Sequence, residues 1–302
     1  MPTTLSEIIR AAIRGLRPIT NNLSLESERN GIDFLGKLET RKLPSNVNII
    51  RWDIGDIPAE WFHHESSPED AVAIYFHGGA YISGSLTSSR VLAVDFVQAL
   101  QMNVLSFEYR LAPEHPFPAA LDDAMKVYKT VLGLGVSSER ITFIGDSAGG
   151  GLLCAAAIRS RDEGLPLPSS LVMISPWVNL TLSGRTYETM RDKDPLLTIA
   201  KLERAVECYT GNKDLKNPYI SPVFGDFKGI PPALIHVGTH ELLLDDARTL
   251  STNMARDGVD VTLDEWEGMW HVWHTFDVPE TAVALERIAD YILTRLGSGE
   301  VD

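Results

Sequence analysis

Cysteine is scarce in this sequence. Only Cys154 and Cys208 occur among its 302 residues. Two cysteines cannot build the framework of several disulfides that stabilises small secreted domains, and they cannot supply the thiolates of a four-cysteine zinc site. Cys154 follows an apolar stretch, so we expect it to be a small residue of the core rather than a reactive thiol.

Basic residues are outnumbered by acidic ones. The chain has 27 Lys and Arg against 41 Asp and Glu, which gives a formal net charge of −14 at pH 7. Nucleic-acid binding needs clustered Lys and Arg to neutralise phosphates, and the sequence has no such cluster. The acidic excess also disfavours an anionic membrane surface, which attracts polybasic segments. We therefore predict no nucleic-acid partner and no membrane partner.

Long apolar runs are missing as well. No uninterrupted apolar segment approaches the ~20 residues that span a bilayer. The first residues lack the charged-then-apolar pattern of a secretory signal, because Arg10 and Arg14 interrupt their apolar positions. These absences predict a cytoplasmic protein.

The composition is that of a globular protein, with 44% hydrophobic and 23% charged residues. Apolar residues recur at helical spacing in 5–16 and again in 25–38, and Pro18 is expected to end the first of these helices. From about residue 46 the pattern changes to that of strands. Two amphipathic helices therefore precede the first strand, and they need a surface later in the chain on which to pack.

Short apolar runs, typical of buried strands, alternate with helical windows in the rest of the chain. The runs are 71–76, 104–107, 141–144, 171–174 and 233–237, and the windows lie near 87–101, 118–132, 148–160 and 242–256. A strand at 259–266 and a helix at 281–296 complete the series. This alternation predicts an α/β fold, a mostly parallel central sheet with helices on both faces.

One connection is longer than the others. Residues 184–217 place a polar segment and a helix where a strand-to-strand connection is usually short, and connections of this length are often lids. We predict that this insertion and the N-terminal helices form a cap above the sheet. The expected organisation is N-terminal cap helices at 1–45, a catalytic core at 46–183 and 218–302, and a cap insertion at 184–217.

The motif Gly145-Asp146-Ser147-Ala148-Gly149 lies between a predicted strand and a predicted helix. G-x-S-x-G in that setting is typical of a nucleophile elbow, a tight turn that presents a serine hydroxyl at the sheet's carboxyl edge. A glycine-rich turn with an unimportant serine is the alternative. The hydroxyl is a weak nucleophile unless an imidazole takes its proton, and the imidazole needs a carboxylate partner. Asp146 should point away into the turn, so we interpret it as structural.

His77-Gly78-Gly79-Ala80 ends another predicted strand. Small residues at this position leave backbone N–H groups free to stabilise the oxyanion of an acyl-transfer intermediate. The N–H groups of Gly78 and Gly79, with that of Ala148, are the predicted oxyanion hole. We interpret His77 as structural, with its ring fixing the loop, and its use as the base is the alternative.

None of four other histidines is expected to bind a metal. His63 and His64 lie in a polar segment and are expected to be solvated. His236 and His240 straddle the end of a predicted strand, so they do not share a helical face. His240-Glu241 is not followed by the second histidine of a zinc-protease helix. We predict no metal and no cofactor.

Together these motifs resemble the hormone-sensitive-lipase family of α/β-hydrolases, whose bacterial branch is called family IV esterases. The resemblance covers nearly all of the chain from about residue 71, and it is loose in the N-terminal helices. It implies the α/β-hydrolase fold with a helical cap, and a serine carboxylesterase that hydrolyses short-chain esters through an acyl-enzyme. The motifs are HGGAYISGS at 77–85, YRLAPEHPFPAALDD at 109–123, GDSAGGGL at 145–152, SPWVNLT at 175–181, NPYISPVFGDFKGIPPALIHVGTHELLLDD at 217–246 and GMWHVW at 268–273.

The resemblance also implies the roles of individual residues. It makes Ser147 the nucleophile, His271 the base and Glu241 the acid, where many relatives have aspartate. It also supports Gly78, Gly79 and Ala148 as oxyanion donors. Nearby residues of the same types remain as alternatives: His274 for the base, and Asp245 and Asp246 for the acid.

The substrate is predicted only as a class, a small-molecule carboxylic ester. Bulky side chains in or beside the motif and cap segments favour a short acyl pocket, for chains of roughly two to eight carbons. Core packing is the alternative for each of them: Tyr81, Trp177, Tyr209 and Trp270. Asn179 stands where the family usually has aspartate, which bears on local packing rather than on the triad.

Other functions remain as alternatives. The family includes non-catalytic ligand receptors that have lost the triad histidine, and the presence of Ser147, Glu241 and His271 disfavours that function. A lipase or an amidase is the second alternative, and the first helix has only ordinary amphipathicity, which does not favour a lipid interface. We also hypothesise a homodimer that forms through strand 259–266, because an open sheet edge invites pairing.

Overall fold

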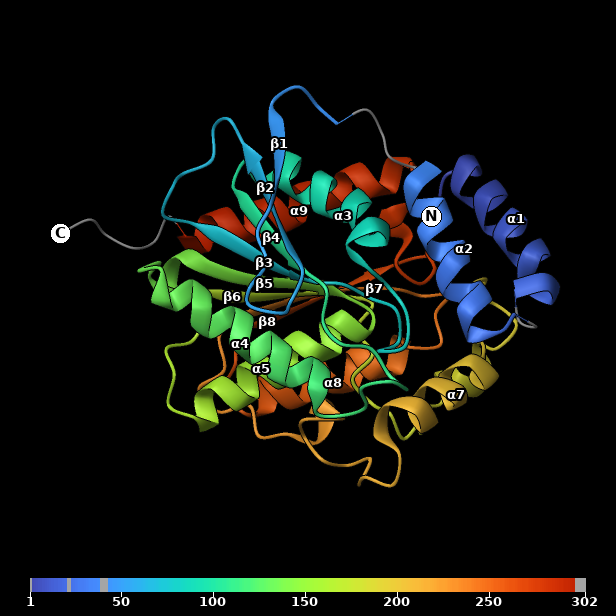
Figure 1. Ribbon diagram of the computed structural model, residues 1–302. Coiled ribbons are helices and arrows are strands. Elements are labelled where there is room, and N and C mark those ends of the chain that lie inside the picture. Colours follow the sequence, from blue (N-terminus) through green and yellow to red (C-terminus); the bar gives the residue numbers. More distant parts are fainter. Residues whose placement is uncertain (1, 21–22, 39–42, 297–302) are drawn as a thin grey trace.

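Eight strands form one sheet in the computed structural model, which describes residues 2–20, 23–38 and 43–296 (Figure 1). The first two strand pairs are antiparallel and all the others are parallel, so the predicted mostly parallel sheet is confirmed. From one edge to the other the strands are β1 (Val47–Arg51), β2 (Ala59–His64), β4 (Asn103–Phe107), β3 (Val72–Phe76), β5 (Ile141–Asp146), β6 (Ser170–Ile174), β7 (Ala233–Gly238) and β8 (Val261–Trp266).

Helices cover both faces of this sheet, as the continuous apolar character of the central strands requires. Every residue of β3, β5, β6 and β7 is buried. One face is covered by α3 (Leu86–Leu100) and α9 (Pro279–Leu296), and the other by α4 (Ala119–Gly133), α5 (Ala148–Asp162) and α8 (Leu244–Arg256) (Figure 1). Short 3₁₀ turns lie in the connections at Ser138–Arg140, Pro222–Phe224 and Trp273–Thr275.

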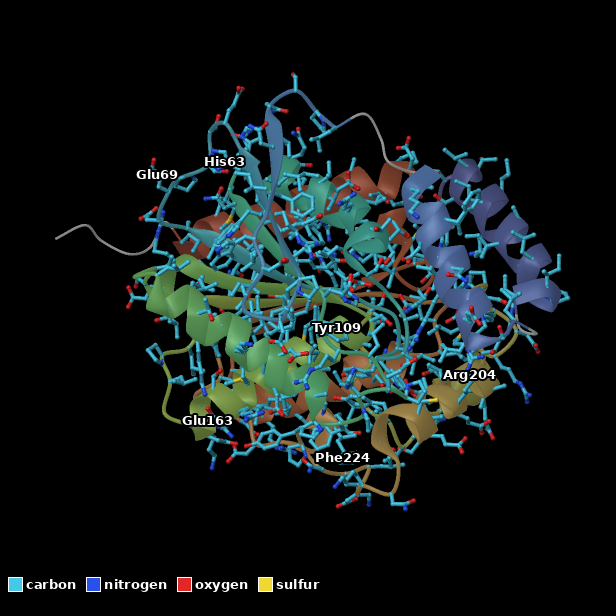
Figure 2. All side chains as sticks on the ribbon, viewed as in Figure 1. His63, Glu69, Tyr109, Glu163, Arg204 and Phe224 are labelled. Carbon is cyan, nitrogen blue, oxygen red and sulfur yellow. The ribbon has the colours of Figure 1, made fainter. Side chains whose placement is uncertain are left out.

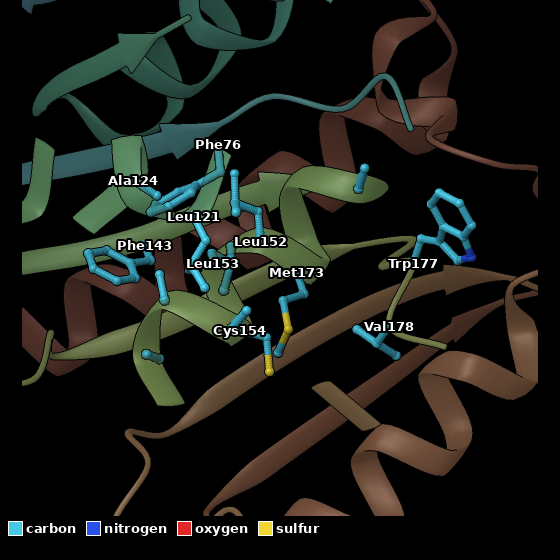
Figure 3. Close-up of a cluster of buried hydrophobic side chains, with 14 of the residues drawn as sticks. Phe76, Leu121, Ala124, Phe143, Leu152, Leu153, Cys154, Met173, Trp177 and Val178 are labelled. Atoms are coloured by element: carbon cyan, nitrogen blue, oxygen red, sulfur yellow. The ribbon is translucent and has the colours of Figure 1, made fainter. Parts of the chain in front are cut away.

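The core under α5 shows how tightly this layer packs. Leu152 and Cys154 of α5 belong to the same buried cluster as Phe143 of β5 and Met173 of β6 (Figure 3). Cys154 is fully buried, and burial raises the pKa of its thiol to about 12. The prediction that Cys154 is a core residue is therefore confirmed.

Three helices outside the layers of the sheet lie together at the right of Figure 1: α1 (Thr4–Thr20), α2 (Leu25–Leu38) and α7 (Ile199–Thr210). The short α6 (Thr186–Thr189) precedes α7 in the chain. Arg204 of α7 (labelled in Figure 2) forms an ion pair with Glu28 of α2, and Lys201 adds a longer one at 3.7 Å. The expected boundaries between cap and core stay a prediction. Residues 1, 21–22, 39–42 and 297–302 of those predicted segments lie outside the described residues.

Two local expectations were wrong. Helix α1 continues past Pro18 to Thr20, because a proline in the last turn removes few helical hydrogen bonds. His63 and His64 are not in a solvated turn but at the end of β2, whose pairing with β1 and β4 was not predicted (Figure 2). His64 is only 4% exposed and lies 2.8 Å from the Asn46 amide nitrogen, while His63 bonds to Asn103 at 2.7 Å.

None of the helices in the described ranges combines the length and the apolar character needed to cross a membrane. Within the same ranges, no three His, Cys, Asp or Glu side chains are arranged to hold a metal ion. The cytoplasmic location stays a prediction.

Candidate active site

A sharp turn between β5 and α5 places Ser147 at the carboxyl edge of the sheet. Its backbone has φ +53° and ψ −120°, a conformation that costs energy for a residue with a side chain. The turn is held because the Ser147 N–H donates to the Ile174 carbonyl at 2.8 Å, and the Ser147 carbonyl accepts from the Trp177 N–H at 2.9 Å. A Cβ at Gly149 would overlap the carbonyl oxygen of Phe76, so this motif position has room only for glycine.

The loops after β7 and β8 bring Glu241 and His271 to this serine. His271 Nε2 lies 2.9 Å from Ser147 Oγ, and His271 Nδ1 lies 3.1 Å from Glu241 Oε2. An ionised carboxylate only accepts hydrogen bonds, so Nδ1 carries the proton and Nε2 is left as an acceptor for the serine hydroxyl. Ser147 is 8% exposed, His271 6% and Glu241 0%. The three residues therefore form a buried hydrogen-bonded chain in which the imidazole can take the serine proton.

The other oxygen of Glu241 is held from two sides. Glu241 Oε1 accepts from Ser175 Oγ at 2.7 Å and from the Gly238 N–H at 2.6 Å. Ser175 Oγ in turn accepts from the Val272 N–H at 3.1 Å, so one hydroxyl ties the acid to the residue after His271. Sequence reasoning missed Ser175. Its only signal was its place as the first residue of the SPW motif, directly after a buried strand.

The alternative acids have other partners. Asp246 is 1% exposed and accepts from the Asn179 N–H at 3.0 Å and from the Tyr187 hydroxyl at 3.1 Å. Asp245 accepts from the Thr186 N–H at 3.2 Å. Both lie in the first turn of α8, and neither forms a hydrogen bond to His271 within the described part of the chain.

The alternative base also lies elsewhere. His274 is fully buried, and its Nε2 is 3.3 Å from Nδ1 of His236, a residue of β7. Burial and the neighbouring His236 hold the pKa of His274 well below its ordinary value. It is therefore a neutral core histidine.

Charges around His271 favour its protonated form. Burial alone lowers the pKa of His271, but the hydrogen bond and the negative charge of Glu241 raise it, and the carboxylates of Asp194 and Asp146 add to that effect. The pKa of His271 is raised above its ordinary value as a result. Asp194, in the predicted cap insertion, accepts from the Leu242 N–H at 2.9 Å, and burial raises its own pKa to about 6. It was not predicted, because nothing local in the sequence connects it to Glu241.

The oxyanion assignment needs one correction. The Gly78 N–H already donates to Asp146 Oδ1 at 2.9 Å, and a Cβ at Gly78 would overlap the same carboxylate. That N–H is therefore not available to a substrate oxygen. The N–H groups of Gly79, Ala80 and Ala148 have no hydrogen-bond partner among the described residues. Gly79 and Ala80 have positive φ values, +120° and +54°, which turn this loop sharply after β3.

His77 and Asp146 hold this loop in place. The His77 ring stacks on Tyr109 at 4.2 Å, and its Nδ1 bonds to the Gly78 carbonyl at 2.7 Å. Asp146 accepts from the Tyr75 hydroxyl at 2.7 Å in addition to the Gly78 N–H. Neither side chain forms a hydrogen bond with Ser147 in the described residues, and their structural roles stay a prediction.

The four predicted pocket residues are packed in the interior. Tyr81 stacks on Tyr209 at 3.9 Å, with Trp177 at 6.1 Å from Tyr81, and Trp270 lies in a separate cluster around Trp273. None of the four is more than 2% exposed. An open cavity of about 1280 Å³ lies beside α7, lined by residues between 180 and 215, and none of Ser147, Glu241 or His271 lines it.

Comparisons with known proteins show the family to which the chain is similar. The profile of a family described as alpha/beta hydrolase fold matches residues 73–275. A protein from Streptomyces hygroscopicus named acetyl-hydrolase is 40% identical over 298 residues, which are 97% of this chain and 97% of that protein. An esterase from Acinetobacter venetianus is 32% identical and covers 94% of this chain and 93% of its own length.

Solved structures are similar over nearly the whole chain. The crystal structure of an esterase from the bacterial hormone-sensitive lipase family has a TM-score of 0.93 and 34% identity, and covers 98% of this chain and 100% of that one. The crystal structure of a hormone-sensitive lipase from a metagenome library has a TM-score of 0.93 and 36% identity, with 98% and 99% covered.

Proposed function

We propose a mechanism for this chain, which belongs to the α/β-hydrolase family and to its hormone-sensitive-lipase group of esterases. In this mechanism Ser147 is the nucleophile, His271 the general base and Glu241 the acid of the triad. The reaction class is carboxylic ester hydrolysis. The observation that carries the proposal is the unbroken hydrogen-bonded chain from Ser147 Oγ through both ring nitrogens of His271 to Glu241 Oε2.

Acylation begins when His271 Nε2 takes the hydroxyl proton while Ser147 Oγ attacks the ester carbonyl carbon. The new C–O bond converts the carbonyl oxygen to an oxyanion, and Glu241 stabilises the imidazolium that forms. Collapse of this intermediate breaks the bond to the alcohol, which leaves with the proton from Nε2. A water molecule then repeats the sequence on the acyl-enzyme, which releases the acid and restores the serine hydroxyl.

We assign the oxyanion to the N–H groups of Gly79, Ala80 and Ala148, because the Gly78 N–H is already bonded to Asp146. Ala148 is the first residue of α5, so its N–H also lies at the positive end of the helix dipole. Three donors in a site nearly closed to solvent suit a charge that develops only during the reaction, and loss of one such donor costs about 3–4 kcal/mol.

The substrate proposed is a small ester with an acyl chain of roughly two to eight carbons. Two features support this class. The triad is nearly closed to solvent, and Trp177, whose N–H donates to the Ser147 carbonyl, packs with Tyr81, which stacks on Tyr209 in the interior. The relative named acetyl-hydrolase indicates a short acyl group for that protein.

A fluorophosphonate probe tests the proposal directly, because it forms a covalent bond only with an activated serine. We expect stoichiometric labelling of the wild-type protein, and none of Ser147→Ala. Labelling should be much slower in His271→Ala. An unlabelled wild-type protein would reject the mechanism and favour the non-catalytic ligand receptor.

A further inference from the structure

Helix α1 is attached to the protein mainly by the side chains on one of its faces. Ile9 and Ile13 are half-buried against the cluster of Met269 and Trp270, beside the histidine loop. An adjacent apolar stripe of the helix faces solvent, so burial of that stripe does not hold the helix. Its members are Leu5, Ile8, Leu16 and Ile19, which are 45%, 61%, 56% and 66% exposed.

The inward face also carries an arginine that contacts two loops at once. Arg10 Nη1 lies 2.7 Å from His240 Nδ1 and 2.7 Å from the carbonyl oxygen of Gly268. One guanidinium nitrogen carries two N–H groups, so it can donate to both acceptors. His240 directly precedes Glu241, and Gly268 lies three residues before His271. The arginine therefore joins the loop of the acid to the loop of the base.

The same two loops are also bonded directly to each other. The His240 N–H donates to the Met269 carbonyl at 2.9 Å, and the Gly268 N–H donates to Thr239 Oγ1 at 2.8 Å. These bonds fix how the two loops lie relative to each other, and Arg10 of α1 adds a bond to each loop. Burial and the positive charges of Arg10 and Lys193 lower the pKa of His240, which favours the neutral ring that can accept this bond.

We propose that Arg10 is a positioning residue for the esterase reaction, which holds Glu241 and His271 at hydrogen-bonding distance by bonding to His240 and to the Gly268 carbonyl. The inference rests on the proposed triad. It predicts that the N-terminal helix acts on the rate of the chemical step and does more than cover the site.

The chain offers two matched controls on the same helix. Arg17 donates to the carbonyl oxygens of Arg191 and Leu197, at 3.2 and 3.3 Å, so it anchors α1 without touching either loop. Arg14 is exposed. If α1 matters only as a covering helix, loss of Arg17 should resemble loss of Arg10. If Arg10 acts by positioning the loops of Glu241 and His271, only Arg10→Ala should change kcat.

The experiment measures kcat and KM on a short p-nitrophenyl ester for Arg10→Ala, Arg10→Lys, Arg14→Ala and Arg17→Ala. For Arg10→Ala we expect kcat to fall about 10- to 100-fold, because displacements of about 1 Å cost that much, while KM changes little. Arg10→Lys should retain more activity than Arg10→Ala, since an ammonium group can still donate. Both control variants should keep kcat near the wild-type value.

Two further readouts separate positioning from stability. Millimolar guanidinium should restore part of the kcat of Arg10→Ala and have no such effect on Arg17→Ala. The acid limb of the pH profile should move to lower pH in Arg10→Ala, because a longer contact between Glu241 and His271 lowers the pKa of that histidine. Asp194 and Asp146 also face His271, and both are unchanged in this variant.

Equal kcat losses in Arg10→Ala and Arg17→Ala, or a loss with neither guanidinium rescue nor a pH shift, would overturn the inference. If Arg10→Ala does not fold, Arg10→Lys and His240→Ala decide the question, because each weakens the same contact. If Ser147→Ala is inactive and Arg10→Ala keeps the wild-type kcat, the positioning role of Arg10 is refuted and the proposed triad is not. Retained activity in Ser147→Ala would refute the proposed triad itself.

Discussion

Replacing Glu241 with glutamine is the sharpest test of the acid, because the surroundings of this side chain leave an amide only one orientation. Oε1 accepts from the Ser175 hydroxyl and the Gly238 N–H, so in Glu241→Gln the amide oxygen must stay on that side. The amide NH₂ group then faces His271 Nδ1. It can only donate, so Nδ1 becomes the acceptor and the ring proton moves to Nε2, where it blocks transfer of the serine proton.

The expected loss follows from this change of tautomer. The corresponding change in a serine protease triad costs about 10⁴-fold in kcat. Because Glu241 is fully buried, no water molecule from bulk solvent replaces the carboxylate. We therefore expect Glu241→Gln to lose about 10³- to 10⁴-fold in kcat, or about 4–5.5 kcal/mol of transition-state stabilisation. The fold should be nearly unaffected, since the shape and the two bonds to Oε1 are kept.

The assay is steady-state hydrolysis of a p-nitrophenyl ester, with thermal melts to confirm folding. Asp245→Asn is the matched control, because Asp245 lies in the same segment but bonds to Thr186 and not to His271. It should keep most of the wild-type kcat. A folded Glu241→Gln variant with more than about a tenth of wild-type kcat would contradict the reasoning, since the wrong tautomer cannot support that rate.

Four further predictions concern the base, the pH dependence, the substrate and the assembly. His271→Ala should lose at least about 10³-fold in kcat. His274→Ala should keep the wild-type kcat and melt at a lower temperature, because it leaves a cavity in the core. The opposite pattern would assign the role of base to His274. The base must be neutral to accept a proton, and its surroundings in the folded protein raise the pKa of His271. The value of kcat/KM should therefore fall as the pH is lowered, with the midpoint of this fall above about pH 6.5. A midpoint below that pH would contradict the raised pKa of His271. Across p-nitrophenyl esters, kcat/KM should be highest for acyl chains of roughly two to eight carbons, and a higher value for C16 than for C4 would count against a short pocket. Strand β8 lies at one edge of the sheet, and we expect a homodimer to form through it. Light scattering that gives a 33.3 kDa particle at micromolar concentration would reject this prediction.

Local patterns in the sequence were enough to predict the class of fold and the segments that carry the site. Runs such as 71–76 and 171–174 are apolar without interruption because both faces of a parallel sheet are covered, and this needs no knowledge of distant contacts. Short motifs likewise identified Ser147, Glu241 and His271 as candidates, and the structure places these three within hydrogen-bonding distance. Their catalytic roles stay a proposal.

Tertiary structure decided which of several similar groups has which partner. The sequence left three carboxylates open, and only the folded loops show Glu241 beside His271, with Asp246 turned to Asn179 and Tyr187. The prediction for Gly78 failed for the same reason, since its N–H is bonded to Asp146, 68 residues away. Arg10 is separated from His240 by 230 residues. Composition and periodicity report burial and backbone conformation, whereas hydrogen-bond partners depend on which loops the fold brings to one edge of the sheet.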